Sequence, residues 1–166
     1  MSTGFRVAAL PADDLERIRA RGVDEFGNAL EPVTVTTAGG TPLRCCLREA
    51  EPGERVVLIA YRPAAVGGPY AEVGPVFVHA EACSGYADEA RYPEGFRARN
   101  QLLRAYDALG RQVENVIVDG PAAERAITDL FGRPGVAYLH SRNVLAGCYM
   151  FAVHPAGDTT ADVTGS

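Results

Sequence analysis

Apolar and polar residues alternate with a period of two along most of the chain, a pattern typical of β-strands that bury one face. Consecutive strands are separated by short turns rich in glycine and proline, such as Gly39-Gly40, which favours antiparallel pairing. The pattern predicts strands at Phe5–Leu10, Val33–Thr37, Leu43–Leu47, Arg55–Tyr61, Pro75–Ala80, Leu102–Asp107, Val113–Val118, Val136–His140 and Cys148–Val153.

Two segments carry helix signals instead. Residues 12–20 follow a proline, have acidic residues in the first turn, and place Leu15 and Ile18 on one side. Residues 121–131 begin with a proline and are followed by Gly132, which is typical of a helix end. Strands with short turns and two helices predict an α+β fold with a mostly antiparallel sheet, its helices covering one face or one end.

The length and composition fit one domain. The chain has 166 residues, of which 47% are hydrophobic and 22% charged, the balance of an ordinary globular protein. We expect a single α+β domain over residues 1–156 with one core, and a flexible C-terminal tail over 157–166, where the residues are small and polar.

Charge and residue usage exclude several partners and reaction classes. The net charge is −5 and all 16 basic residues are arginine, without a tight basic cluster, so a nucleic-acid partner is not expected. The absence of lysine excludes a Schiff-base lysine and a P-loop lysine. No stretch reaches the roughly 18 apolar residues of a membrane span, and the N-terminus does not resemble a signal peptide. These features predict a cytoplasmic protein.

The cysteines and histidines do not predict a metal or cofactor site. The chain has four cysteines and three histidines, but no C-x-x-C or H-E-x-x-H motif. Cys45 and Cys46 are assigned to a strand, where neighbouring side chains point to opposite faces. We therefore expect reduced thiols, no structural zinc, no other metal and no bound cofactor.

Several short segments, in order along residues 5–154, are similar to the bacterial family called domain of unknown function 1203. They are Glu49-Ala50-Glu51-Pro52-Gly53-Glu54, Pro69-Tyr70, Gly74-Pro75-Val76-Phe77-Val78, Arg104-Ala105-Tyr106-Asp107, Val118-Asp119-Gly120, Val136-Ala137-Tyr138-Leu139-His140-Ser141-Arg142-Asn143 and Gly147-Cys148-Tyr149. The resemblance implies no particular activity. Relatives tend to read His-x-His-Asn before Gly-Cys-Tyr, whereas the second histidine position here is Arg142. One histidine beside an arginine is a poor cation site.

The candidate site lies on the predicted strand through Tyr138, His140 and Arg142, whose side chains share one face at two-residue spacing. Arg104 and Tyr106 share a face in the same way. An imidazole, guanidinium groups and phenols that converge would suit a small carboxylate or enolate. Polar residues are also ordinary where a strand runs into a turn, so both interpretations stay open.

Our functional hypothesis is a small-molecule enzyme that performs metal-free acid/base chemistry, of isomerase, cyclase or lyase type, on an anionic or carbonyl-containing metabolite. His140, Tyr106 and Tyr138 are the candidate catalytic residues. The candidate substrate-binding residues are Arg142, Arg104, Asn143 and His79. The alternative is a non-catalytic ligand-binding or protein-interaction module, in which the same residues form a structural polar network.

Three of these residues have a structural alternative. Arg104 could bridge to Asp107 or Asp119 rather than to a ligand. His79 ends a predicted strand, where a solvent-facing histidine is common. Cys83, in a small-residue turn, could be an exposed nucleophile or an unreactive thiol.

Overall fold

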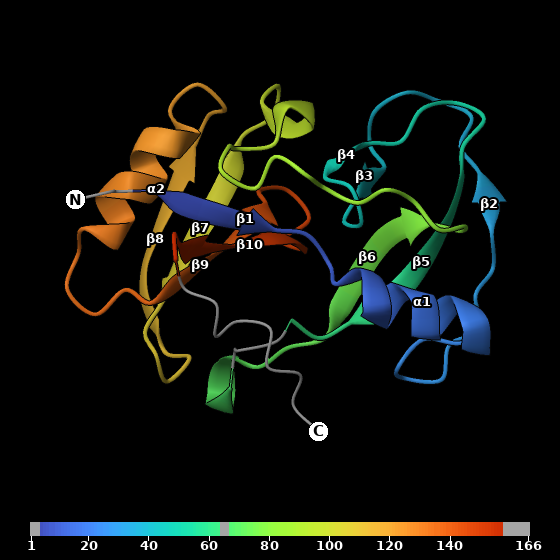
Figure 1. Ribbon diagram of the computed structural model, residues 1–166, viewed down its shortest axis with the longest axis horizontal. Helices are drawn as coiled ribbons and strands as arrows, with labels where there is room; N and C mark the ends of the chain where they lie inside the picture. The colour runs from blue at the N-terminus through green and yellow to red at the C-terminus, as the bar shows by residue number, and fades with distance from the viewer. Residues whose placement is uncertain (1–3, 64–66, 158–166) are drawn as a thin grey trace.

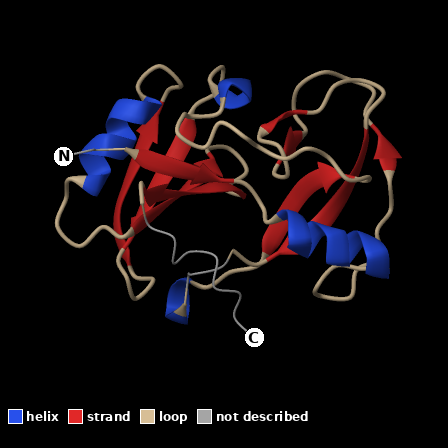
Figure 2. Ribbon diagram, in the orientation of Figure 1, coloured by secondary structure: helices blue, strands red, loops and turns tan. Residues whose placement is uncertain are grey.

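The strands divide between two five-stranded sheets in the computed structural model, which describes residues 4–63 and 67–157 (Figures 1 and 2). The elements are β1 (Phe5–Ala8), α1 (Ala12–Arg21), β2 (Val33–Thr34), β3 (Pro42–Leu43), β4 (Arg48–Glu49), β5 (Arg55–Tyr61), the 3-10 turn η1 (Gly68–Tyr70), β6 (Gly74–His79), the 3-10 turn η2 (Glu94–Phe96), β7 (Gln101–Tyr106), β8 (Gln112–Val118), α2 (Ala123–Phe131), β9 (Tyr138–Asn143) and β10 (Tyr149–Pro155).

The first sheet has the order β1-β10-β9-β7-β8 and the second has the order β2-β5-β6-β3-β4. Every pair in the first sheet is antiparallel. The second sheet is antiparallel except where β3 runs parallel to β6. The predicted α+β class with mainly antiparallel pairing is therefore confirmed.

Helix α2 covers one face of the first sheet. Its buried residues Ala123, Ile127 and Leu130 pack in one cluster with Leu103 of β7 and Phe151 of β10. The helix is amphipathic because these apolar positions recur at spacings of three and four residues. This core leaves the opposite face of the sheet free for other contacts.

Helix α1 packs against the second sheet, so the two helices do not share one face as expected from the sequence (Figure 1). Leu15 and Ile18 join a second core cluster that includes Val57 of β5. Tyr149 and Ala152 of β10 also belong to this cluster, which joins the two sheets. The expectation of one core was wrong, because strand alternation does not specify how strands are shared between sheets.

The strand predicted at Leu43–Leu47 is wrong as well. Residues 44–47 form a turn between the two-residue strands β3 and β4. The turn is closed by a hydrogen bond from the Leu47 amide to the Leu43 carbonyl at 3.0 Å, and Leu47 has a φ of 57°. A β-strand excludes that left-handed conformation, so side chains in this segment do not alternate between two faces.

The remaining differences concern boundaries. The predicted strand Val33–Thr37 keeps only two residues, and the predicted Val136–His140 strand lies two to three residues further along, at Tyr138–Asn143. In the described part of the chain, none of the helices has the length and apolar character needed to cross a membrane. The predicted tail over 157–166 falls, except for Gly157, outside the described residues.

Candidate functional site

Five of the predicted site residues lie together on the face of the first sheet that is opposite α2. Arg104 of β7 pairs directly with His140 of β9, and Tyr106 pairs with Tyr138 in the same ladder. Arg142 follows two residues after His140, and therefore lies on the same face. The period-two pattern of these two strands is what brings them together. We call Arg104, Tyr106, Tyr138, His140 and Arg142 the polar face.

Aromatic rings surround the imidazole of His140. The ring centroids of Tyr106, Tyr138 and Tyr149 lie 5.0, 5.5 and 4.9 Å from that of His140. Tyr106 and Tyr138 stack on one another with a centroid separation of 5.2 Å. His140 is only 2% exposed. The histidine is therefore held in one orientation by packing rather than by solvent-exposed contacts.

Two arginines converge on one carboxylate at the edge of the polar face. Arg142 forms an ion pair with Glu72, which precedes β6, and Arg104 lies 3.7 Å from the same carboxylate oxygen. Arg142 also donates from Nε to the Gly147 carbonyl at 2.9 Å, which fixes its side chain. The Arg142 side chain is 6% exposed, whereas that of Glu72 is 42% exposed. The fixed guanidinium of Arg142 is thus paired with the carboxylate of Glu72, which has room to move into solvent.

Four buried polar atoms of the polar face lack a hydrogen-bond partner among the described residues: Nδ1 of His140, the hydroxyl of Tyr106, Nε of Arg104 and Nη1 of Arg142. Of these, only Nη1 of Arg142 has an ion-pair partner, Glu72. Leaving such an atom unpaired costs roughly 1–3 kcal/mol. Buried polar groups without a protein partner call for a water, an ion or a ligand. The polar face therefore has buried donors and acceptors, on neighbouring residues of β7 and β9, that a bound molecule could pair with.

Burial dominates the electrostatics of His140. Its pKa is lowered to about 3, chiefly by removal from solvent, and electrostatic repulsion from Arg142, His154 and Arg104 acts in the same direction. The imidazole is consequently neutral at pH 7. Burial also raises the pKa of Tyr138 to about 12, so this phenol keeps its proton. Neutral groups that can donate or accept a proton lie beside two permanent cations.

This arrangement suits an anion or a polarised carbonyl rather than a cation. Guanidinium groups bind carboxylates and phosphates through two parallel hydrogen bonds. A neutral imidazole can accept a proton from a bound molecule or donate a hydrogen bond to it. The two arginines beside the single histidine would repel a metal ion.

The other two predicted site residues lie elsewhere. The side-chain oxygen of Asn143 accepts hydrogen bonds from the amides of Leu145 and Ala146, both at 2.9 Å, and so caps the β9–β10 turn. His79 ends β6 in the second sheet, where its ring contacts Cys45, Cys46 and Glu54. Neither residue is brought to the polar face.

Sequence reasoning missed Glu72 and the surroundings of His79. Glu72 lies in a loop that has no hydrophobic period, so no pattern indicated its contacts. Cys45, Cys46, His79 and Cys83 form a group with metal-ligand chemistry. The spacing of three residues between His79 and Cys83, within the usual range for a local ligand pair, was the available signal.

Comparison with known protein families matches residues 40–154 to the family described as "Protein of unknown function (DUF1203)". The match includes β3 to β9 and nearly all of β10, and so contains the whole polar face. No curated protein and no solved structure matches the chain.

Proposed function

We propose a function for this chain, which belongs to the DUF1203 family of proteins of unknown function: it binds a small anionic or carbonyl-containing metabolite on the polar face, and His140 exchanges a proton with that metabolite. The observation that carries the proposal is the gathering of unpartnered polar atoms of His140, Tyr106 and Arg104 beside the guanidinium of Arg142. A carboxylate or enolate oxygen would accept hydrogen bonds from Tyr106 and Arg104, while His140 exchanges a proton with the bound molecule.

The position of Glu72 supports an anion site between the two arginines. Its carboxylate already occupies the position between Arg142 and Arg104, but its side chain is partly exposed and comes from a loop. A ligand carboxylate that displaces Glu72 would keep both arginines paired. The net binding energy would therefore be the difference between the interaction of the arginines with the ligand carboxylate and their interaction with Glu72. This exchange favours ligands that also contact Tyr106 and His140.

Ligand binding would also change the proton affinity of His140. Burial and, to a smaller extent, repulsion from Arg142, His154 and Arg104 lower its pKa. A ligand carboxylate that replaces Glu72 raises this pKa in so far as its negative charge lies closer to His140 than that of Glu72. His140 would then accept a proton from the carbon next to a carbonyl, while the arginines and the Tyr106 hydroxyl stabilise the enolate oxygen. Proton transfer would thus be coupled to binding.

Titration calorimetry with small mono- and dicarboxylates, 2-oxo acids and phosphate monoesters tests the binding step. We expect at least one class to bind the wild-type protein, and Arg142→Ala to weaken it by at least about tenfold. Arg125→Ala is the matched control, because Arg125 is exposed on α2 and lies away from the polar face. Binding that Arg142→Ala leaves intact would place the ligand elsewhere.

Exchange of solvent deuterium into a bound carbonyl compound, followed by NMR, tests the proton transfer. We expect wild-type protein to catalyse the exchange and His140→Gln to abolish it while ligand still binds. A ligand that binds through Arg142 without any exchange would identify a non-catalytic binding module instead.

A further inference from the structure

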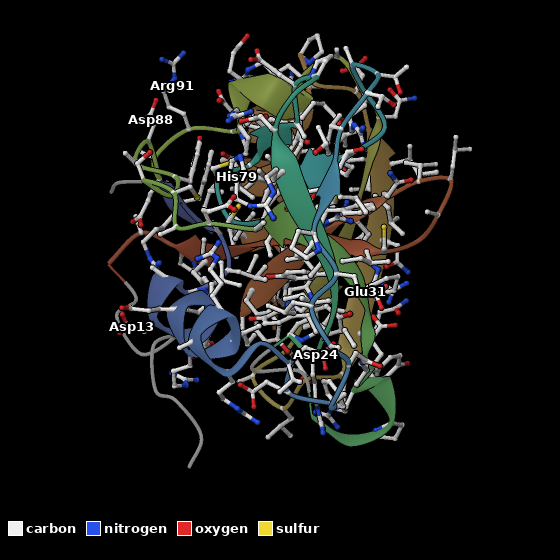
Figure 3. All side chains as sticks on the ribbon, turned by 90° about the vertical axis from the view of Figure 1, so that its right-hand side faces the viewer. Asp13, Asp24, Glu31, His79, Asp88 and Arg91 are labelled. Atoms are coloured by element: carbon white, nitrogen blue, oxygen red, sulfur yellow. The ribbon has the colours of Figure 1, made fainter. Side chains whose placement is uncertain are left out.

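A second group of chemically reactive side chains lies at one end of the second sheet and shares no residue with the polar face. Cys45 and Cys46 lie in the turn between β3 and β4, His79 ends β6, and Cys83 lies in the loop that follows (His79 is labelled in Figure 3). Their three sulfur atoms and one imidazole nitrogen all lie within 4.8 Å of one another. We propose that these four side chains bind one Zn²⁺ ion tetrahedrally.

The distances between the ligand atoms match such a site. Zinc bonds of about 2.3 Å to sulfur and about 2.0 Å to nitrogen give tetrahedral edges of about 3.8 Å between sulfurs and about 3.5 Å between sulfur and nitrogen. The Sγ atoms of Cys45 and Cys46 are 4.0 Å apart, and they lie 3.5 and 3.9 Å from Nδ1 of His79. The side chains therefore need only small adjustments to hold the ion.

A carboxylate, that of Glu54, orients His79 for metal coordination. Oε1 of Glu54 lies 3.0 Å from Nε2 of His79, so the proton of the imidazole belongs on Nε2 and the lone pair on Nδ1. That lone pair faces the sulfur atoms. A carboxylate behind a metal-binding histidine is a common feature of zinc sites, because it fixes the ring and makes it a better donor.

Glu54 is itself held in place from two sides. Both of its oxygens accept hydrogen bonds from the guanidinium of Arg48, at 2.6 and 2.9 Å, and Oε2 also accepts one from the Glu51 amide at 2.7 Å. In addition, the His79 amide donates to Sγ of Cys45 at 3.3 Å, a contact that favours a negatively charged sulfur. The surroundings of the ligands are thus already ordered.

Zinc would join parts of the chain that have little regular structure of their own. Strands β3 and β4 contain two residues each, and Cys83 lies in a long segment between β6 and β7 in which η2 is the only regular element described. An ion held by Cys45, Cys46, His79 and Cys83 would link this segment to the second sheet. Four protein ligands leave no position for a substrate, as in structural rather than catalytic zinc sites.

A ligand set of three thiolates and one imidazole favours zinc over hard divalent cations. Hard cations such as Mg²⁺ and Ca²⁺ prefer oxygen ligands, whereas Zn²⁺ accepts sulfur and nitrogen in tetrahedral geometry. Co²⁺ enters such sites in place of zinc and reports their geometry through its absorption spectrum.

Metal analysis of untagged protein purified under reducing conditions tests the proposal directly. We expect about one zinc ion per chain in the wild-type protein, and a content near zero in Cys46→Ser and Cys83→Ser. Cys148→Ser is the matched control and should keep its zinc, because Cys148 lies outside the group, next to Arg44. Zinc content equal to wild type in both cluster variants would overturn the proposal.

Two measurements remain informative if a cysteine variant fails to fold. Wild-type protein freed of metal by a chelator should take up one equivalent of Co²⁺ and show thiolate charge-transfer bands with the intense visible bands of tetrahedral cobalt. Glu54→Gln should still bind zinc, but about 10- to 100-fold more weakly in competition with a chelator. Reduced wild-type protein that takes up neither zinc nor cobalt would refute zinc binding.

Zinc binding and the proposed function can fail separately. His140→Gln should retain the full zinc content, since His140 belongs to β9 of the first sheet. A loss of zinc in His140→Gln equal to that in Cys83→Ser would also contradict the assignment.

Discussion

Arg104 and His140 are directly opposed across the β7–β9 ladder, so a permanent cation faces a buried imidazole. Such a pair is unfavourable when the histidine is protonated, and it persists because His140 stays neutral. An anion placed between the two side chains would remove the conflict. Several measurable properties depend on this relationship.

The first prediction concerns pH. The pKa of His140 is about 3 in the folded protein, against about 6.5 in an unfolded chain. Between these values the unfolded state binds more protons, so the stability that depends on neutral His140 is present above about pH 6.5 and is lost as pH falls. We expect the free energy of unfolding to fall between about pH 7 and about pH 5 by about 2 kcal/mol more in wild type than in His140→Asn. Urea titrations at both pH values measure this difference, and equal losses would contradict the buried, neutral state.

The second prediction concerns Glu72, whose carboxylate competes with any ligand for Arg142. Glu72→Gln removes the competing charge, so anions that bind the polar face should bind several-fold more tightly. The folded protein should become less stable by about 1 kcal/mol, because a nearly buried guanidinium loses a partly exposed partner. Calorimetry and thermal unfolding measure the two effects. Unchanged affinity would show that Glu72 does not occupy the ligand position.

The third prediction concerns Asp24, which is fully buried and is labelled in Figure 3. Its carboxylate accepts hydrogen bonds from the amides of Phe26, Asn28 and Ala60 at 2.8 to 3.0 Å, and so ties the loop after α1 to β5. Asp24→Ala should lower the free energy of unfolding by about 3 kcal/mol, because it leaves these buried donors unpaired.

Two comparisons make the Asp24 measurement specific. Asp24→Asn should cost less than Asp24→Ala, since an amide oxygen can still accept some of the bonds. Asp13→Ala, at an exposed position in the first turn of α1, should have an effect below about 0.5 kcal/mol. Equal effects of Asp24→Ala and Asp13→Ala would argue against the hydrogen-bonded loop.

The fourth prediction concerns Gly120, which precedes α2. A Cβ atom at this position would lie 2.0 Å from the carbonyl oxygen of Arg97, a contact that only movement of the backbone can relieve. Gly120→Ala should therefore destabilise the protein by about 3 kcal/mol or more. Gly74→Ala is the control, because a Cβ at Gly74 would have no atom within 4 Å. Similar melting temperatures for the two variants would be inconsistent with the close approach of the backbone.

Local periodicity and the signals at helix ends were sufficient to predict most strands, both helices and the members of the polar face. Arg104, His140 and Arg142 were grouped correctly because residues two apart in a strand share a face and because β7 and β9 pair in register. The division of strands between two sheets depends on long-range pairing, such as β1 with β10, which the pattern of a single chain does not reveal.

The cysteine group shows where local reasoning fails. Cys45 and Cys46 were placed on opposite faces because the segment was assigned to a strand. In the turn, with Leu47 in the left-handed region, their sulfur atoms approach to 4.0 Å. The other members, His79 and Cys83, come from β6 and the following loop, so only the folded chain brings the set together.

The pairing of β1 with β10 has a consequence for any shortened form of the chain. The family match begins at residue 40, so β1 lies outside it, yet β1 covers one side of the largely buried strand β10. On the outer side of β1, the Val7 amide donates a hydrogen bond to the Glu89 carbonyl at 2.7 Å. A chain trimmed to residues 40–154 would present a row of bare amides and carbonyls along an apolar strand. Such an edge can pair with a strand of another molecule, so we expect β1 to protect the full chain against aggregation through β10.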